Sequence, residues 1–352
     1  MWLLLRATLL GCGATRPLPE RALAALALTV GGSTVLLDCG EGTQTALARH
    51  GVSPYRVDAI LLTHYHGDHI FGLPGLLQTM AGLGRTAPLL LAGPAGLETL
   101  AGALAVLAGP FPFPVELAEF PDCRGTLSAG LMQAEAFPLR HRAPCCGYRL
   151  TLPRAGRFDP CRARALGIPV ALWKRLQQGE TVDGFAPEQV IGPARRGLTV
   201  VYGTDTAPCP ALRSAAQGAD LLCMDATYAD DTDLPKAKLY GHSTCTQAGQ
   251  LAAAAGVRRL WLTHYSAAVT DPEPGLAAAR AAFAAAEAGF DGKTLELTFD
   301  EELIFEKESA VYAGGAGGGG AAVCAVPPDA GQYRRRACRG ADLRRPPDHP
   351  DL

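Results

Sequence analysis

The sequence predicts an α/β protein with two sheets covered by helices. Strand-like and helix-like segments alternate in both halves of the chain, but they form no single continuous βαβ series. An apolar fraction of 48% with only 19% charged residues is typical of a compact globular protein. With 352 residues the chain can bury a large core, as one big domain or two smaller ones.

The first 120 residues supply the first of the two expected sheets. Residues 57–64 (VDAILLTH) are continuously apolar, which predicts a strand buried on both faces. Gly51 closes a short expected helix over 41–51. The other expected strands cover 1–10, 21–30, 33–40 and 88–94, and the other expected helices cover 72–84 and 97–107.

The second half repeats this alternation after a strand-like stretch over 131–150. Strands are expected at 198–206, 220–227 and 258–266, Ala-rich helices at 246–256 and 275–288, and a closing strand region at 294–306. We therefore expect one ordered domain over 1–311. The segment 312–352 is rich in Gly, Pro and Arg, a composition that cannot bury a core, so we expect it to be disordered.

Composition also limits the class of protein. A net charge of −2 gives no global basic field for nucleic acid, so any polyanion needs a local patch. The eleven cysteines are scattered without a CxxC pair and are interpreted as reduced thiols of a cytoplasmic protein. The apolar start is interrupted by Arg6 and is read as a strand rather than a signal peptide. No charge-free run of 18 apolar residues occurs, so no membrane span is expected.

The stretch LLTHYHGDHI, residues 61–70, carries the strongest chemical signal. In an extended segment His64 and His66 point the same way, so both imidazoles can reach one metal ion. Asp68 and His69 follow Gly67 and can reach a second ion nearby. Imidazole nitrogen with carboxylate oxygen suits zinc, although manganese or iron occupies similar sites. Two such ions about 3.5–4 Å apart would clamp a phosphate and acidify a bridging water.

This motif resembles the signature of the metallo-β-lactamase superfamily, and its flanks resemble ribonuclease Z, the tRNA 3′-processing endonuclease. LDCGEGTQTAL upstream, IFGLPGLLQTM downstream and the later GHST carry the likeness, which runs through most of residues 5–306. The resemblance implies a metallo-β-lactamase-like αββα sandwich that holds two zinc ions. It implies seven ligands: His64, His66 and His141 on one ion, Asp68, His69 and His264 on the other, and Asp205 between them.

The resemblance also implies the residues that move protons. His242, in GHST, matches a histidine that protonates the departing oxygen during phosphodiester cleavage. Its partner in the family is a glutamate, where this chain has Asp225, one methylene shorter. A structural hydrogen bond is the alternative role for His242. Family accounts give Asp68 a second role, as acceptor of the proton from the attacking water.

Residues 154–196 lie where the family inserts an arm that grips tRNA. This segment holds eight Arg or Lys and four Asp or Glu, a balance of +4 that fits phosphate contacts. A solvated loop with incidental charge is the alternative. Trp173 could stack on a base or pack the arm down. The candidate substrate-binding residues are Arg162, Arg164, Trp173, Lys174 and Arg175.

The resemblance implies an endoribonuclease that cuts precursor tRNA after the discriminator base, as a homodimer in which each arm serves the partner's site. Several departures bear on substrate handling. Val170 and Ala171 replace the arm's usual Gly-Pro, and Ala268 and Val269 replace a basic and aromatic pair; GYRLT lacks an acidic residue. A paralogue hydrolysing small or cyclic phosphodiesters is therefore the first alternative. A metal-holding RNA-binding protein without turnover is the second.

Overall fold

The computed structural model describes residues 4–299 and 305–307. The description below concerns the unit Met1–Ser309. The predicted tail over 312–352 lies outside the described residues. No helix among the described residues is long and apolar enough to cross a membrane.

The first sheet has eight strands in the order β15-β14-β1-β2-β3-β4-β5-β6. Strands β15, β14, β1, β2 and β3 pair antiparallel, whereas β3 to β6 run parallel to one another. The strands are β1 (Leu5–Gly11), β2 (Ala25–Val30), β3 (Ser33–Leu37), β4 (Val57–Leu61), β5 (Leu89–Pro94), β6 (Val115–Phe120), β14 (Thr294–Leu297) and β15 (Phe305–Lys307).

The second sheet has seven strands in the order β13-β12-β11-β10-β9-β8-β7. Here β10 to β13 run parallel, and β7 to β10 pair antiparallel. The strands are β7 (Gly125–Ala129), β8 (Met132–Pro138), β9 (Cys146–Arg154), β10 (Arg195–Gly203), β11 (Leu221–Asp225), β12 (Leu260–Thr263) and β13 (Ala286–Ala288).

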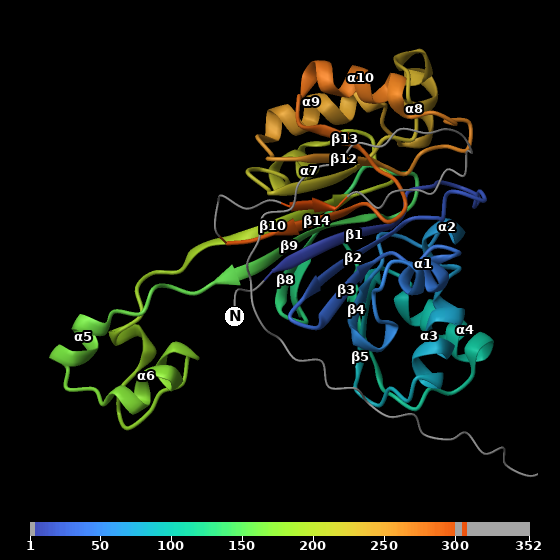
Figure 1. The fold of residues 1–352 in the computed structure, drawn as a ribbon. Coiled ribbons are helices and arrows are strands. Elements are labelled where there is room, and N and C mark those ends of the chain that lie inside the picture. The colour runs from blue at the N-terminus through green and yellow to red at the C-terminus, as the bar shows by residue number, and fades with distance from the viewer. Residues whose placement is uncertain (1–3, 300–304, 308–352) are drawn as a thin grey trace, which may run out of the picture. The chain divides into compact units, whose positions relative to one another are not determined.

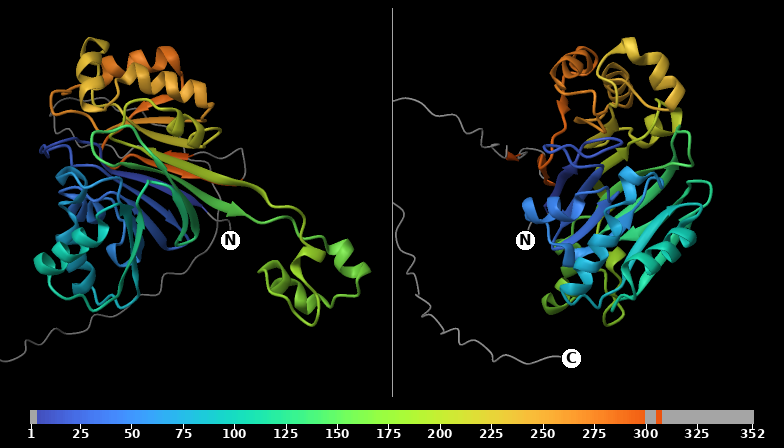
Figure 2. Two further views of the ribbon diagram at one scale, coloured as in Figure 1. Left: turned by 180° about the vertical axis from the view of Figure 1, so that it is seen from behind. Right: turned by 90° about the vertical axis from the view of Figure 1, so that its right-hand side faces the viewer.

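Helices cover the outer face of each sheet, which gives the four predicted layers (Figures 1 and 2). On the first sheet lie α1 (Thr43–Arg49), α3 (Leu73–Gly82) and α4 (Leu97–Ala108), packed over Leu36, Ile60 and Leu91. On the second lie α7 (Pro210–Ala215), α9 (Cys245–Ala255) and α10 (Glu273–Ala282). Burying both faces of each sheet explains the continuous apolar runs of β4 and β11.

The strand arrangement places the site at one edge of the sandwich. Parallel neighbours end at the same edge of a sheet, and ligands of α/β proteins bind there. The chain leaves β4, β10, β11 and β12 at this edge, and the histidines and aspartates singled out in the sequence follow directly. Two short helices, α2 (Gly67–Ile70) and α8 (Leu234–Tyr240), lie in the connecting segments.

Strands β9 and β10 lead at their other ends into the inserted segment, called the arm below (residues 155–194; Figure 1). It carries α5 (Pro160–Ala165) and α6 (Val170–Gln177). The arm has its own small core of Ala163, Ile168, Leu176, Val182 and Val190. It is therefore a packed unit and not an open loop.

Three expectations need correction. The helix expected over 275–288 ends at Ala282, and Ala286–Ala288 instead pair with β12 as β13, because an alanine run fits either element and edge pairing decides. The motif expected to form a loop to His69 becomes helical at Gly67. Strands β6 and β7 were not expected.

Candidate metal centre and active site

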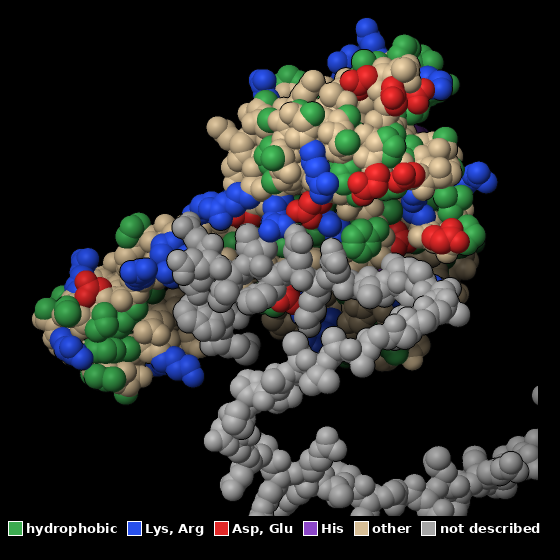
Figure 3. Space-filling view, turned by 45° about the horizontal axis from the view of Figure 1, so that its top comes forward, with side chains coloured by type: hydrophobic (Ala, Val, Ile, Leu, Met, Phe, Trp, Pro, Cys, Tyr) green, Lys and Arg blue, Asp and Glu red, His purple; other side chains and the backbone are tan. Residues whose placement is uncertain are grey.

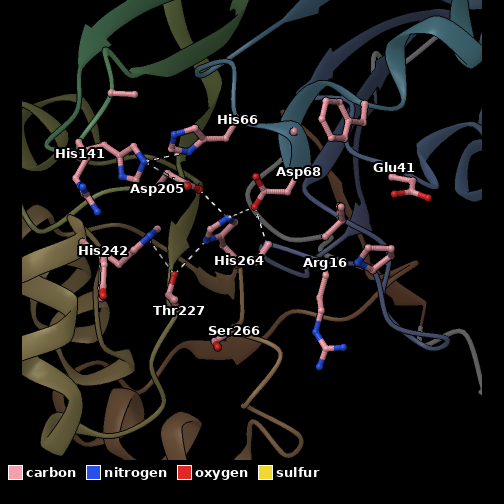
Figure 4. A pocket seen from close by; sticks show the side chains of 18 of the residues that line it. Arg16, Glu41, His66, Asp68, His141, Asp205, Thr227, His242, His264 and Ser266 are labelled. Atoms are coloured by element: carbon pink, nitrogen blue, oxygen red, sulfur yellow. Dashed lines mark hydrogen bonds and ion pairs between the residues drawn. The ribbon is translucent and has the colours of Figure 1, made fainter.

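The side chains predicted to hold metal converge in the structure from four separate segments (Figure 4). Three imidazoles and one carboxylate come from the segment after β4, and single ligands follow β8, β10 and β12. Four of these seven side chains lie in residues that are at least 98% buried: His64, His69, Asp205 and His264. Such a concentration of buried imidazole and carboxylate groups requires compensation for lost hydration.

The first group of donors comprises His64, His66, His141 and Asp205. Their candidate ligand atoms all lie within 4.8 Å of one another. His64 Nε2 is 2.9 Å from His66 Nδ1, which in turn is 3.5 Å from His141 Nε2. The two histidines of the HxH motif thus face the same point, as the period of an extended chain requires.

The second group comprises Asp68, His69 and His264, whose candidate ligand atoms also lie within 4.8 Å of one another. His69 Nε2 is 3.2 Å from His264 Nε2, and Asp68 Oδ2 is 3.5 Å from the same His264 nitrogen. Both groups offer only N and O donors, the set that suits zinc and similar divalent ions.

Asp205 lies between the two groups with one oxygen toward each. Its Oδ1 is 3.1 Å from His69 Nε2 and 2.8 Å from His264 Nε2. Its Oδ2 is 3.5 Å from His64 Nε2 and 3.8 Å from His141 Nε2. A carboxylate placed in this way can bridge two cations, so the donor set fits a two-metal centre.

Hydrogen bonds on the far side of the rings orient most of these histidines. In four of the five, the nitrogen that faces away from the centre contacts an oxygen, which fixes the tautomer and leaves Nε2 to coordinate. The pairs are His64 with Thr63 (3.0 Å), His69 with Asp38 (2.7 Å), His141 with the Gly241 carbonyl (3.2 Å) and His264 with Thr227 (3.1 Å).

Asp38 belongs to the LDCGEG stretch that resembles ribonuclease Z, but the sequence alone assigned it no role. Asp38 is fully buried, and its carboxylate accepts from the Thr63 amide at 2.8 Å besides holding His69. The next residues wrap around the motif: a Cβ on Gly40 would meet the Asp68 carbonyl at 2.3 Å. Only glycine permits this approach. An aspartate at the end of a strand was the available signal.

The carboxylates of the centre are held ionised. Burial alone would raise the pKa of Asp205, but the charges of His264 and His69 hold that pKa well below its usual range. Asp68 behaves likewise, because its interactions with the same two histidines outweigh burial and lower its pKa. Burial would lower the pKa of His264, yet Asp205 raises it to about 10. Protons therefore compete with metal ions for these nitrogens, and acid weakens metal binding.

His242 lies beside the centre and is held by Asp225. His242 Nδ1 is 2.7 Å from Asp225 Oδ2, so the shorter side chain does reach the imidazole. Asp225 also accepts from the amides of Thr206, Thr227 and Ser243 at 3.1, 2.9 and 3.1 Å. The Thr227 hydroxyl is a fifth donor, at 2.9 Å, so the carboxylate is fixed and ionised, and its pKa is lowered by His242 despite burial.

A cleft of about 900 Å³ opens over the centre. Asp68 and His242 lie on opposite sides of His264 in it (Figure 4). Thr15, Arg16, Phe71 and Tyr240 line its outer parts. The sequence pattern indicated none of these four, because nothing in their spacing connects them with the motif.

The structure does not bring the predicted substrate-binding residues of the arm to this cleft. Arg195 at the start of β10 pairs with Arg154 at the end of β9, whereas Asp205 follows the other end of β10. The arm is thus about one nine-residue strand away from the centre, roughly 30 Å.

Within the arm, the five predicted residues divide into two kinds. The exposed ones are Arg162, Arg164, Lys174 and Arg175. Figure 3 shows Lys and Arg side chains spread over the arm. Trp173 is half-buried: its indole N–H donates to the Ile168 carbonyl at 3.0 Å and its ring packs on Phe158. Of the two roles considered for Trp173, its position therefore fits packing within the arm.

Comparisons with known proteins agree with this geometry. Residues 23–81 match the family model described as metallo-beta-lactamase superfamily, and residues 174–265 match the one described as beta-lactamase superfamily domain. The structure of the metallo-beta-lactamase fold protein YhfI from Bacillus subtilis superposes with a TM-score of 0.62 at 21% identity, covering 84% of this chain and 100% of that one. Fold and site together define a protein of the metallo-β-lactamase superfamily.

Proteins with similar sequences narrow the class of protein from the superfamily to one family. The chain is 42% identical to ribonuclease Z of Lachnospira eligens, covering 84% of this chain and 98% of the relative. It is 44% identical to ribonuclease Z of Salinibacter ruber, covering 82% and 93%. The short form of human tRNase Z superposes with a TM-score of 0.58 at 25% identity, covering 82% and 98%. The chain belongs to the ribonuclease Z family.

Proposed function

We propose that the protein is a zinc-dependent endoribonuclease that removes the 3′ trailer of precursor tRNA by cutting after the discriminator base. One observation carries the proposal: in a chain of the ribonuclease Z family, Asp205 turns one oxygen toward each of two converging donor groups, 2.8 Å from His264 and 3.5 Å from His64. His242, with Asp225 behind it, lies beside them.

Two metal ions would be held by the seven side chains described above. When bound, they supply positive charge for the scissile phosphate and a water that is more acidic than bulk water. Zinc is the ion that five imidazoles and two carboxylates favour, and manganese or iron would suit the same donors.

Asp68 and His242 would handle the two protons of the reaction. Asp68 Oδ2 already accepts a hydrogen bond from the Thr15 amide at 2.7 Å, which orients it, and it would accept the proton of the attacking water. His242 would donate a proton from Nε2 to the departing 3′ oxygen, since Asp225 holds Nδ1. The products are a 3′ hydroxyl on the tRNA and a 5′ phosphate on the trailer.

The arm would bind the tRNA backbone away from the cut. Arg162, Arg164, Lys174 and Arg175 are exposed and suited to phosphate contacts. Because the arm starts at the end of β9 opposite to the metal centre, we propose a homodimer in which one subunit's arm serves the partner's cleft. The nine cysteines among the described residues are free thiols, which supports a reducing compartment such as the cytoplasm.

The test is the cleavage of a 3′-extended precursor tRNA by purified protein supplied with zinc or manganese, with the ends mapped. A single cut after the discriminator base should be lost in Asp68→Ala and in His242→Ala. His50→Ala is the matched control, because His50 caps the end of α1 away from the centre. If the wild-type protein hydrolysed only a small diester, the alternative of a small-phosphodiester hydrolase would hold instead. If it bound RNA without cutting it, the alternative of a non-catalytic RNA-binding protein would be favoured.

A further inference from the structure

Phe71 has an unusual place for a large apolar side chain. It is 68% exposed, and it lines the cleft three residues after Asp68. Single exposed apolar residues are common on protein surfaces. This one differs because it lines the outer part of the cleft over the metal centre, where an RNA substrate must lie.

The ring packs on the backbone of the preceding helical turn. Phe71 N–H donates to the Gly67 carbonyl at 2.9 Å, so the two residues are one helical turn apart. A Cβ built on Gly67 would meet the Phe71 ring at 2.3 Å from Cε2 and 2.6 Å from Cζ. The ring therefore lies directly over the Gly67 backbone. Gly67 lacks the left-handed backbone that usually demands glycine, so its missing side chain makes room for this ring.

The proposed reaction tells which nucleotide lies on this side. His242 would protonate the 3′ oxygen that leaves with the tRNA, so the last tRNA nucleotide lies toward His242. Asp68 lies on the other side of His264 (Figure 4): its Oδ2 is 3.5 Å from His264 Nε2, whereas the His242 ring stacks on His264 with centroids 5.5 Å apart. The chain beyond the scissile phosphate then continues past Asp68 toward Phe71.

We infer that Phe71 is a stacking platform for the first base of the 3′ trailer. This inference rests on the proposed function and adds to it a binding position for one nucleotide of the substrate. An aromatic face accepts any base, because every base has a π-face, so the platform holds the trailer without reading its sequence. It holds the nucleotide that is joined to the scissile phosphate through its 5′ oxygen, a bond that stays intact while the 3′ oxygen departs.

The experiment compares wild type with Phe71→Leu, which stays apolar but has no π-face, and with Phe71→Trp, which keeps one. Each cleaves a precursor tRNA with an ordinary first trailer nucleotide and one that is abasic there. Phe71→Leu should lower kcat/KM on the ordinary substrate by about 5- to 100-fold. It should change little on the abasic substrate, and Phe71→Trp should restore the rate.

A binding measurement separates stacking from catalysis. In the His242→Ala background, 2-aminopurine at the first trailer position should be quenched on binding, and the quenching should disappear when Phe71→Leu is added. Tyr55→Leu is the matched control, because Tyr55 is 48% exposed and lies at the amino end of β4, away from the cleft. Metal content should be the same in all variants.

Three results would overturn the inference: equal cleavage by Phe71→Leu and wild type, an equal loss on both substrates, or coupling to the last tRNA base instead of the first trailer base. A wild type that cut no precursor tRNA would instead overturn the proposed function, so the two failures are distinguishable.

Discussion

At the residue scale, several residues of the centre have a left-handed backbone conformation that residues other than glycine rarely adopt. Asp38, Asp205 and His264 have φ of 57°, 59° and 62°, and Thr15, whose amide holds Asp68, has 67°. Each costs about 1 kcal/mol or more, and such strain persists where surrounding contacts fix it. The hydrogen bonds of Asp38 and the converging charges at Asp205 supply those contacts here.

Prediction at this scale concerns Asp225 and the pH dependence of cleavage. Burial lowers the pKa of His242, but Asp225 outweighs it and raises that pKa above its ordinary value. The acid form of His242 thus persists to higher pH, and cleavage falls as pH rises through the raised pKa. Asp225→Asn removes the charge, so the alkaline limb of kcat should move to lower pH. At neutral pH kcat should fall about tenfold or more, but less than the roughly 10²–10⁴-fold expected for losing a general acid.

The measurement is a pH profile of kcat for both proteins at saturating metal. Asp220→Asn is the control, because Asp220 is also buried, at 2% exposed, but directly precedes β11 at the end of that strand away from the cleft. An unchanged alkaline limb in Asp225→Asn would show that Asp225 does not set the protonation of His242.

The residue scale also shows what the sequence could reveal about the site. The spacing of His64, His66, Asp68 and His69 indicated a metal site because it is local. His141, Asp205 and His264 were found only through the resemblance, since they are brought in by long-range strand pairing. Asp38 and Phe71 carry no spacing signal, and only the fold places Asp38 behind His69 and Phe71 in the cleft.

At the element scale, burial on both faces made the central strands predictable. The expected strand over 57–64 and the expected helix over 97–107 agree closely with β4 (Val57–Leu61) and α4 (Leu97–Ala108). Prediction was wrong where one composition suits two elements, as in the alanine run that ends α10 and gives β13. Strands β6 and β7 lie at sheet edges and are mostly exposed or half-buried without strict alternation, so their pattern is weak.

The arm yields a prediction about an element. Its residues form their own core, and Arg154 and Arg195 pair across β9 and β10 where it begins. Replacing residues 155–194 by Asn-Gly should close these strands as a hairpin and leave the sandwich folded. KM for precursor tRNA should rise at least tenfold, and the salt dependence of binding should weaken by about one unit for each lost phosphate contact.

Hydrolysis of a small diester is the internal control for this excision. The arm lies at the far end of β9 from the metal centre, so turnover of a substrate that fills only the cleft should not change. Thermal unfolding and metal content establish that the shortened protein is intact. A parallel loss of both activities would mean that the arm supports the fold of the centre instead of binding tRNA.

At the scale of the whole molecule, the distance between arm and cleft constrains how the parts cooperate. The two are separated by the nine residues of β9, roughly 30 Å. A tRNA is long enough to span such a distance on one subunit. Closed homodimers offer the other solution, because a two-fold axis gives each cleft the arm of its partner.

The last prediction distinguishes these two solutions by mixing inactive subunits. The arm-excised protein keeps its metal centre, and Asp68→Ala keeps its arm, so neither should process precursor tRNA efficiently alone. If the arm acts on the partner, co-expressed subunits should recover roughly a quarter of wild-type kcat/KM, since half of the dimers are mixed and each has one complete site. In the control, the Asp68→Ala subunit also lacks the arm. No arm can then be donated to the intact metal centre, and the recovered cleavage should disappear. Mixed dimers that form, as measured by native mass spectrometry, without recovered cleavage would show that each arm serves its own cleft.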